Sequence, residues 1–191
     1  CGYEGPTRKK SILELRKKQL RNAFALTILS QGTPLIYGGD EFGNTQYGNN
    51  NPYNQDNATG YVKWTRSTFA TELLNFVKDL IRIRQSHPSI GCDHALTGRD
   101  YLSYGYPDVS MHGEELWRAD IGPTSHCFGI LYYDKYADDK DNRLIYLIYN
   151  MHWEAQSVAV PRLKGGAGWE LSLSNDETNA YDGTNAMSIA P

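Results

Sequence analysis

The residues best suited to chemistry are two adjacent carboxylates, Asp40 and Glu41. Glycoside hydrolysis uses a pair of carboxyl groups, one as an acid and one as a nucleophile or base. Here both groups directly follow an apolar run that predicts a strand, and adjacent strand residues point to opposite faces. They would not flank one bond at the roughly 5–9 Å separation that the reaction requires. We therefore expect a structural role for Asp40 and Glu41 at the end of a strand.

A polar segment over residues 43–66 carries six asparagines. Amide side chains both donate and accept hydrogen bonds, as sugar hydroxyls do, and tyrosine rings offer a flat apolar face. We therefore expect this loop to bind carbohydrate. The candidate substrate-binding residues are Tyr47, Asn49, Asn50, Asn51, Tyr53, Gln55 and Asp56. The alternative is a turn region whose side chains bond their own backbone.

The five histidines show no metal-ligand spacing, so we expect no metal and no cofactor. His112 is the histidine to follow, because it lies in a Met-His-Gly turn. No phosphate-binding glycine loop, CxxC motif or Ser-His-Asp arrangement is apparent in the sequence, which leaves the polar loop as the main candidate site.

The composition allows an uncharged substrate and disfavours two classes of partner. The formal net charge is -3, from 19 basic and 22 acidic residues, which offers no attraction for nucleic acid or an anionic membrane. No apolar run reaches the roughly 20 residues of a membrane helix. The three widely spaced cysteines favour a reducing compartment, and we expect a cytoplasmic protein.

The elements that position the loop are two helices and a strand. A capping-box pattern at Ser11 and Glu14 predicts the start of the first helix, whose second half is apolar nearly all round and is expected to be buried on several sides. Residues 35–38 form a short apolar run between breakers, which predicts a strand covered on both faces. Residues 67–85 predict the second helix, because Phe69, Leu73, Phe76, Leu80 and Ile83 share one helical face.

Beyond Pro88, runs of β-branched and aromatic residues predict strands at residues 127–133, 143–149, 157–160 and 169–173. Residues 144–149 alternate poorly in polarity, which predicts a central strand. The acidic link over 134–142 predicts a hairpin connection, and residues 170–191 are expected to fray. The chain is thus expected to be of the α+β class, with one domain over residues 1–95 and an antiparallel domain over residues 96–191.

Four motifs together carry a family resemblance. They are Cys1-Gly2-Tyr3-Glu4-Gly5-Pro6-Thr7, the stretch from Gly39-Asp40-Glu41 to Asn49-Asn50-Asn51, Gln55-Asp56-Asn57, and Tyr149-Asn150-Met151-His152-Trp153. They resemble the alpha-amylase superfamily of glycoside hydrolases, and within it the isoamylase, glycogen-debranching and pullulanase-like branch.

The resemblance implies the C-terminal portion of such an enzyme. Residues 1–95 would supply the last βα elements of a (β/α)8 TIM barrel, with residues 35–38 as its eighth strand, and residues 96–191 an antiparallel C-terminal β-sandwich. The parent would hydrolyse α-1,6 branch linkages in glycogen, amylopectin or pullulan by a retaining mechanism. Its three catalytic carboxylates would precede Cys1, so no catalytic residue is assigned in this chain. Active sites lie at the carboxyl ends of barrel strands, so the polar loop would contact the glucan.

By itself the chain is expected to be inactive, because one strand cannot close a barrel. Its expected partners are an α-glucan and the missing N-terminal barrel segment. Helix faces that would pack on that segment are expected to drive self-association. A second hypothesis makes the β half an α-glucan-binding or barrel-stabilising module without catalysis.

Overall fold

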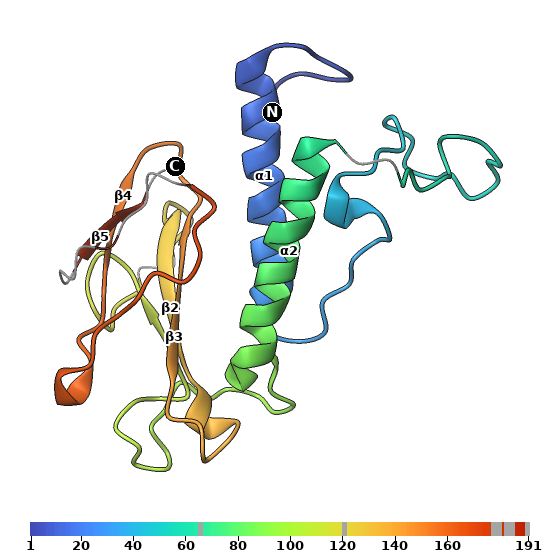
Figure 1. The fold of residues 1–191 in the computed structure, drawn as a ribbon. Helices are drawn as coiled ribbons and strands as arrows, with labels where there is room; N and C mark the ends of the chain where they lie inside the picture. Colours follow the sequence, from blue (N-terminus) through green and yellow to red (C-terminus); the bar gives the residue numbers. More distant parts are fainter. Residues whose placement is uncertain (65–66, 120–121, 177–180, 182–185, 190–191) are drawn as a thin grey trace. The chain divides into compact units, whose positions relative to one another are not determined.

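The computed structural model describes residues 1–64, 67–119, 122–176, 181 and 186–189, and the chain divides into two compact units, Cys1–Ser86 and His87–Pro191. The first unit is built on helices and the second on antiparallel strands (Figure 1), so the predicted α+β mixture is confirmed. The predicted loop over 43–66 and the predicted fraying end over 170–191 lie partly outside the described residues. Neither helix in the described part of the chain is long and apolar enough to cross a membrane.

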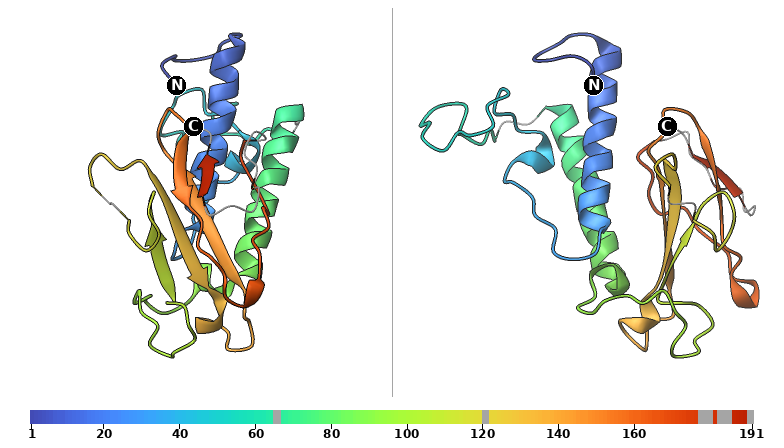
Figure 2. Two further views of the ribbon diagram at one scale, coloured as in Figure 1. Left: turned by 90° about the vertical axis from the view of Figure 1, so that its left-hand side faces the viewer. Right: turned by 180° about the vertical axis from the view of Figure 1, so that it is seen from behind.

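Two helices, α1 (Lys10–Leu29) and α2 (Thr68–Ser86), lie side by side in the first unit (Figure 1 and Figure 2). The prediction for α2 is confirmed to within one residue at each end. Apolar side chains of both helices are buried: Phe24, Ile28, Leu29, Leu73, Phe76, Val77 and Leu80. Each buried side chain contributes roughly 1.5–3 kcal/mol relative to an exposed one, so burial of these residues stabilises the helices.

The start of α1 differs from the prediction. The helix begins at Lys10, so Ser11 lies inside its first turn, and no side-chain hydrogen bond caps the helix. The Lys9 N–H instead donates to Thr7 Oγ1 at 3.2 Å. The expected burial on several sides is also wrong, because Ala23 is exposed and the buried residues form the narrower face that includes Phe24.

The predicted buried strand over residues 35–38 is wrong for this structure. The segment belongs to no sheet, Leu35 is 91% exposed, and Tyr37 is exposed as well. A strand covered on both faces needs neighbouring strands, and the described residues of the first unit contain none. The segment ends at Gly39, whose φ of 103° favours glycine, and leads into the short 3-10 helix η1 (Asp40–Phe42).

Arg84 joins α2 to the C-terminal end of α1. Its guanidinium donates to the carbonyl oxygens of Ile28 and Ser30, each at 2.7 Å, and to the carbonyl oxygen of Gly32. The last carbonyl groups of a helix lack partners within the helix, and the planar arginine fork satisfies several at once. Arg84 therefore fixes the point where the chain leaves α1.

The second unit contains two antiparallel sheets. Strands β1 (Val109–His112), β2 (Cys127–Tyr133) and β3 (Leu144–Asn150) pair in that order, and β4 (Gln156–Ala159) pairs with β5 (Ala186–Ile189). Short 3-10 helices lie between them: η2 (Pro88–Gly91), η3 (Asp134–Tyr136) and η4 (Lys164–Gly166). Figure 2 shows both sheets from two further sides. The antiparallel sheets agree with the prediction for this half of the chain.

Individual strands agree with the prediction to different degrees. The bounds of β2 are those predicted, and those of β3 and β4 are each one residue off. However, β3 lies at the sheet edge and β2 at its centre, so the predicted central position of residues 144–149 is wrong. Residues 169–173 form no strand. The sequence analysis also missed β1 and β5.

Tyrosine side chains fill much of the core of the second unit. One buried cluster combines Leu131 with Tyr106, Tyr133 and Tyr136. Their hydroxyl groups have polar partners: Tyr136 Oη lies 2.6 Å from Asp100 Oδ1, and Tyr106 Oη accepts the backbone N–H of Lys164 at 2.6 Å. Several of the tyrosines therefore pack in the core of this unit, with their polar hydroxyl groups hydrogen-bonded.

Candidate functional site

Asp40 and Glu41 lie in η1, the turn that follows the exposed segment over 35–38. The Glu41 carboxylate accepts the backbone N–H of Gly39 at 2.8 Å. Partial burial, and secondly the charge of Glu41, raise the pKa of Asp40. In this geometry Glu41 stabilises the turn, and its carboxylate is committed to the backbone instead of a second reacting group.

The polar loop after η1 extends away from the two helices (Figure 1). Several of its asparagine side chains bond the backbone two residues further on. The oxygen of Asn49 accepts the N–H of Asn51 at 2.8 Å, and that of Asn51 accepts the N–H of Tyr53 at 3.3 Å. These are the local turns that the alternative interpretation anticipated. They fix the loop backbone while leaving its side chains at the surface.

The aromatic residues of this loop are exposed to solvent. Tyr53 is 94% exposed, and Tyr47 and Trp64 are also exposed. The Lys63 ammonium lies 4.2 Å from the centroid of the Tyr47 ring and also contacts its hydroxyl group. The backbone N–H of Lys63 donates to Asn44 Oδ1 at 3.1 Å, which closes the loop at its base. Lys63 therefore holds one exposed ring in place.

All seven predicted substrate-binding residues lie in this one loop. Asn50, Asn51 and Asp56 are exposed, whereas Asn49 and Gln55 are half-buried. Asp56 accepts the Tyr61 hydroxyl at 2.5 Å, and this hydrogen bond raises the pKa of Tyr61. The sequence analysis missed the contact of Lys63 with Tyr47, because the two residues are sixteen positions apart in a loop and no sequence pattern links them.

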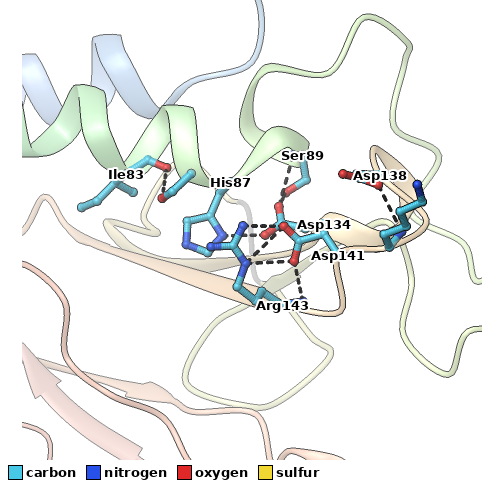
Figure 3. A network of polar contacts seen from close by, with 9 residues as sticks. Ile83, His87, Ser89, Asp134, Asp138, Asp141 and Arg143 are labelled. Carbon is cyan, nitrogen blue, oxygen red and sulfur yellow. Dashed lines mark hydrogen bonds and ion pairs between the residues drawn. The ribbon is translucent and has the colours of Figure 1, made fainter.

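A second polar network surrounds Asp134 in the second unit (Figure 3). Asp134 is fully buried and lies 2.6 Å from His87 Nδ1, and it accepts both the hydroxyl of Ser89 at 2.5 Å and its N–H at 3.2 Å. Through these contacts Asp134 joins η2 to η3, and the three residues form a structural cluster.

Asp141 and Arg143 form an ion pair beside this network in Figure 3. The arginine Nε donates to both carboxylate oxygens, at 2.9 and 3.1 Å. This hydrogen bonding lowers the pKa of Asp141. The pair lies in the connection between β2 and β3 and stabilises that turn.

His112 is fully buried at the end of β1. Its Nδ1 accepts the backbone N–H of Trp117 at 3.0 Å, so its Nε2 carries the proton and faces Ser110 Oγ at 2.8 Å. Burial lowers the pKa of His112 to about 4. His112 is therefore a neutral structural residue. Over the described residues, no group of three or more His, Cys, Asp or Glu side chains could hold a metal ion.

Solved structures define the class of fold. The chain matches apo pullulanase from Paenibacillus barengoltzii with a TM-score of 0.66 and 21% identity, over 93% of this chain and 24% of that chain. It also matches the pullulanase of Anoxybacillus sp. LM18-11 complexed with maltotetraose, with a TM-score of 0.64 and 20% identity, over 92% of this chain and 22% of that chain. The fold is thus that of part of a pullulanase. A scan against protein-family profiles gives no match.

Comparison with curated relatives narrows the class of protein to which the chain is similar. The chain is 31% identical to Isoamylase 1, chloroplastic, of Arabidopsis thaliana over 95% of its length, and 36% identical to Isoamylase 3, chloroplastic, of Oryza sativa subsp. japonica over 84%. It is 46% identical to a glycogen operon protein GlgX homolog of Mycobacterium tuberculosis over 46% of its length. It spans 22%, 19% and 12% of these relatives. The chain is a homologue of the isoamylase and glycogen-debranching glycoside hydrolases and matches their C-terminal part.

Proposed function

We propose that this chain is the C-terminal part of a glycoside hydrolase that cleaves α-1,6 branch linkages in glycogen- and starch-type α-glucans. The observation that carries the proposal is the 31% identity to Isoamylase 1 across 95% of the chain. The chain spans only 22% of Isoamylase 1 and 19% of Isoamylase 3, which supports a parent with further polypeptide that would hold the catalytic carboxylates. A retaining mechanism is part of the proposal, with two of those groups about 5–5.5 Å apart.

The exposed segment over residues 35–38 supports a place for the first unit in a barrel. An apolar run bounded by breakers suits a parallel strand buried on both faces, yet Leu35 is 91% exposed here. Strands from the rest of the parent would cover it. We thus propose that residues 1–95 complete the (β/α)8 barrel and that residues 96–191 form its C-terminal β-sandwich.

The loop after η1 is the proposed glucan contact. Tyr47 and Tyr53 present exposed rings for the apolar face of a sugar, and the neighbouring Asn49, Asn50 and Asn51 supply amide groups for its hydroxyls. Gln55 and Asp56 extend the polar surface. The backbone turns in the loop reduce the entropy lost on binding. Asp40 and Glu41 are proposed to support the loop from its base.

An assay of hydrolysis by the chain alone tests whether the catalytic carboxylates lie in the rest of the parent. The 191 residues incubated with pullulan or glycogen are expected to release no reducing ends. The complete gene product should release them, and the sugar first formed should keep the anomeric configuration of the substrate. Release by the chain alone would contradict the proposal.

Retention on immobilised starch tests the loop. The variant with Tyr47→Ala and Tyr53→Ala is expected to be retained less than the wild type, because the two tyrosine stacking surfaces of the loop are removed. Leu171→Ala is the matched control, since Leu171 is exposed but lies in the second unit. Equal retention of the double variant and the wild type would exclude the loop as the glucan contact.

A second candidate function is an α-glucan-binding or barrel-stabilising β-module without catalysis. The tyrosine-rich core favours stabilisation, because most of those rings are inside the unit. In either case the proposed partners are an α-glucan and the N-terminal barrel segment. The helix faces expected to drive self-association are not exposed in this structure, because their apolar residues, among them Ile28 and Leu73, are buried. We propose instead that, without that segment, the chain self-associates through exposed residues such as Leu35 and Tyr37, and a concentration-independent monomer in sedimentation would contradict this. A cytoplasmic location stays part of the proposal.

A further inference from the structure

The turn between β3 and β4 is held by a compact set of hydrogen bonds. Asn150 accepts the N–H of His152 at 2.9 Å, and its side-chain amide donates to the carbonyl oxygen of Glu154 at 2.9 Å. The N–H of Glu154 donates to His152 Nδ1 at 3.0 Å. The N–H of Met151 donates to the carbonyl oxygen of His126 at 2.6 Å. The backbone of this turn is therefore fixed from both sides.

This rigid turn presents a tryptophan to solvent. Trp153 is 77% exposed, and its indole stacks on the His152 ring with centroids 4.1 Å apart and planes 26° apart. The centroid of the His126 ring lies 5.9 Å from that of His152, with the two planes tilted. A ring that is both exposed and held in place can stack on a flat apolar surface without first losing rotamer freedom.

A second exposed indole lies at the same end of the sheet. Trp117 packs edge-on against His112, with ring centroids 4.8 Å apart, and has a φ of 62°, a strained value for a bulky residue. His112 ends β1 and pairs with Gly129 of β2, while Asn150 ends β3 and pairs with Cys127 of β2. β1 and β3 are therefore about 10 Å apart across the sheet. Trp117 and Trp153 thus follow strands that are separated by one strand, at the same end of the sheet.

We propose that Trp153, stacked on His152 in the turn after β3, is a binding platform for an α-glucan chain on the second unit. The indole face accepts the C–H face of a glucose ring, and the exposed side chain of Glu154, the next residue in the chain, offers acceptors to the hydroxyls. The fixed turn means that little conformational entropy is lost on binding. The choice of an α-glucan as ligand depends on the proposed function.

Affinity electrophoresis of the full 191-residue chain in gels containing amylopectin tests this inference. Trp153→Ala is expected to weaken retardation about tenfold, and Trp153→Phe, which keeps a smaller ring, by less. Tyr101→Ala is the matched control, because Tyr101 is an exposed aromatic residue that contacts Tyr136 beyond the other end of β2. It should leave retardation unchanged, and circular dichroism checks that each variant is folded.

Three results would overturn the inference: no retardation of the wild-type chain, equal retardation of Trp153→Ala and wild type, or an altered sedimentation coefficient of Trp153→Ala with unchanged retardation. The last result would assign Trp153 to contact between copies of the chain.

Failure of this inference can be distinguished from failure of the proposed function. If only the Tyr47 and Tyr53 double variant loses glucan binding, the platform is refuted and the loop contact stands. If Trp153→Ala loses binding while the complete gene product leaves branched glucan intact, the platform stands.

Discussion

Two fully buried carboxylates in the second unit are each held by several donors. Asp108 accepts the backbone N–H groups of Thr97 and Gly98 at 2.6 and 2.8 Å, and Asp134 accepts both the N–H and the hydroxyl of Ser89. A buried charge costs free energy unless such bonds compensate it, and the donors in turn depend on the acceptor. Single substitutions of these two buried carboxylates are therefore expected to have large effects on the stability of the second unit.

Removal of the Asp134 carboxylate is expected to destabilise the second unit. Asp134→Ala leaves the hydroxyl and N–H of Ser89 buried without their acceptor, which should lower the free energy of unfolding by roughly 2–4 kcal/mol. Asp139→Ala is the control, since Asp139 is exposed in the same connection, and its effect should stay within about 0.5 kcal/mol. Urea denaturation measures both. Equal midpoints for the two variants would refute the assigned role of Asp134.

His112 is expected to make stability depend on pH. Its pKa falls from 6.5 to about 4 through burial, so the unfolded chain binds the proton more tightly than the folded one. The contribution of neutral His112 to the free energy of unfolding is complete above pH 6.5 and is lost as the pH falls from 6.5 toward 4. Denaturation at pH 7.5 and pH 5 should show this fall. His112→Gln should reduce the difference, while the control His94→Gln, at an exposed position, should preserve it.

At the scale of elements, the contact between α1 and α2 depends on Arg84. Arg84→Lys keeps the charge but loses the planar fork that reaches the carbonyl oxygens of Ile28, Ser30 and Gly32. We expect the free energy of unfolding of the first unit to fall by about 1.5–3 kcal/mol. Arg82→Lys on the same helix is the control, because Arg82 makes an exposed pair with Asp79. A loss of the same size in both would show that the fork is not needed.

The sheet of the second unit is expected to tolerate no side chain at position 129. A Cβ on Gly129 would clash with the ring and hydroxyl oxygen of Tyr146, and this hydroxyl group donates to the carbonyl oxygen of Ala159 at 2.8 Å. Gly129→Ala should displace that ring and destabilise the unit by at least about 1–3 kcal/mol, measured by thermal unfolding. A Cβ on Gly168 would lie in open space, so the control Gly168→Ala should change the thermal midpoint little. An unchanged midpoint for Gly129→Ala would mean that Tyr146 moves aside at no cost.

Elements with their own periodicity were predictable, and those that depend on neighbours were not. The apolar spacing of residues 67–85 located α2, because one buried helix face is visible in sequence. The run over 35–38 gives no information about whether strands lie beside it, and here none does among the described residues. Four residues of mixed polarity at Val109–His112 are too short for a recognisable alternation, so β1 was missed.

The candidate loop was predictable in position but not in geometry. The amide-rich composition located residues 43–66, whereas the turns that commit Asn49 and Asn51 to the backbone depend on local dihedral angles. The contact of Lys63 with Tyr47 spans sixteen residues of an aperiodic loop and could not be inferred from spacing. The exposure of Trp153 likewise depends on the fold of its turn.

At the scale of the whole molecule, the chain spans only about a fifth of its isoamylase relatives, 22% of Isoamylase 1 and 19% of Isoamylase 3. Its exposed segment at Leu35 and Tyr37 agrees with an origin in a larger protein, since these side chains are unfavourable in water. The proposed division assigns glucan contact and barrel completion to this chain and the chemistry to the remaining polypeptide. This division is the central claim.

The most direct test is a branched-glucan assay on the complete gene product and on the 191-residue chain, side by side. Reducing ends and chain lengths released from amylopectin are measured for both at equal molar concentration. We expect the complete product to release linear chains by cutting at branch points and the chain alone to release none. Release by the chain alone, or intact branches after treatment with the complete product, would contradict the account.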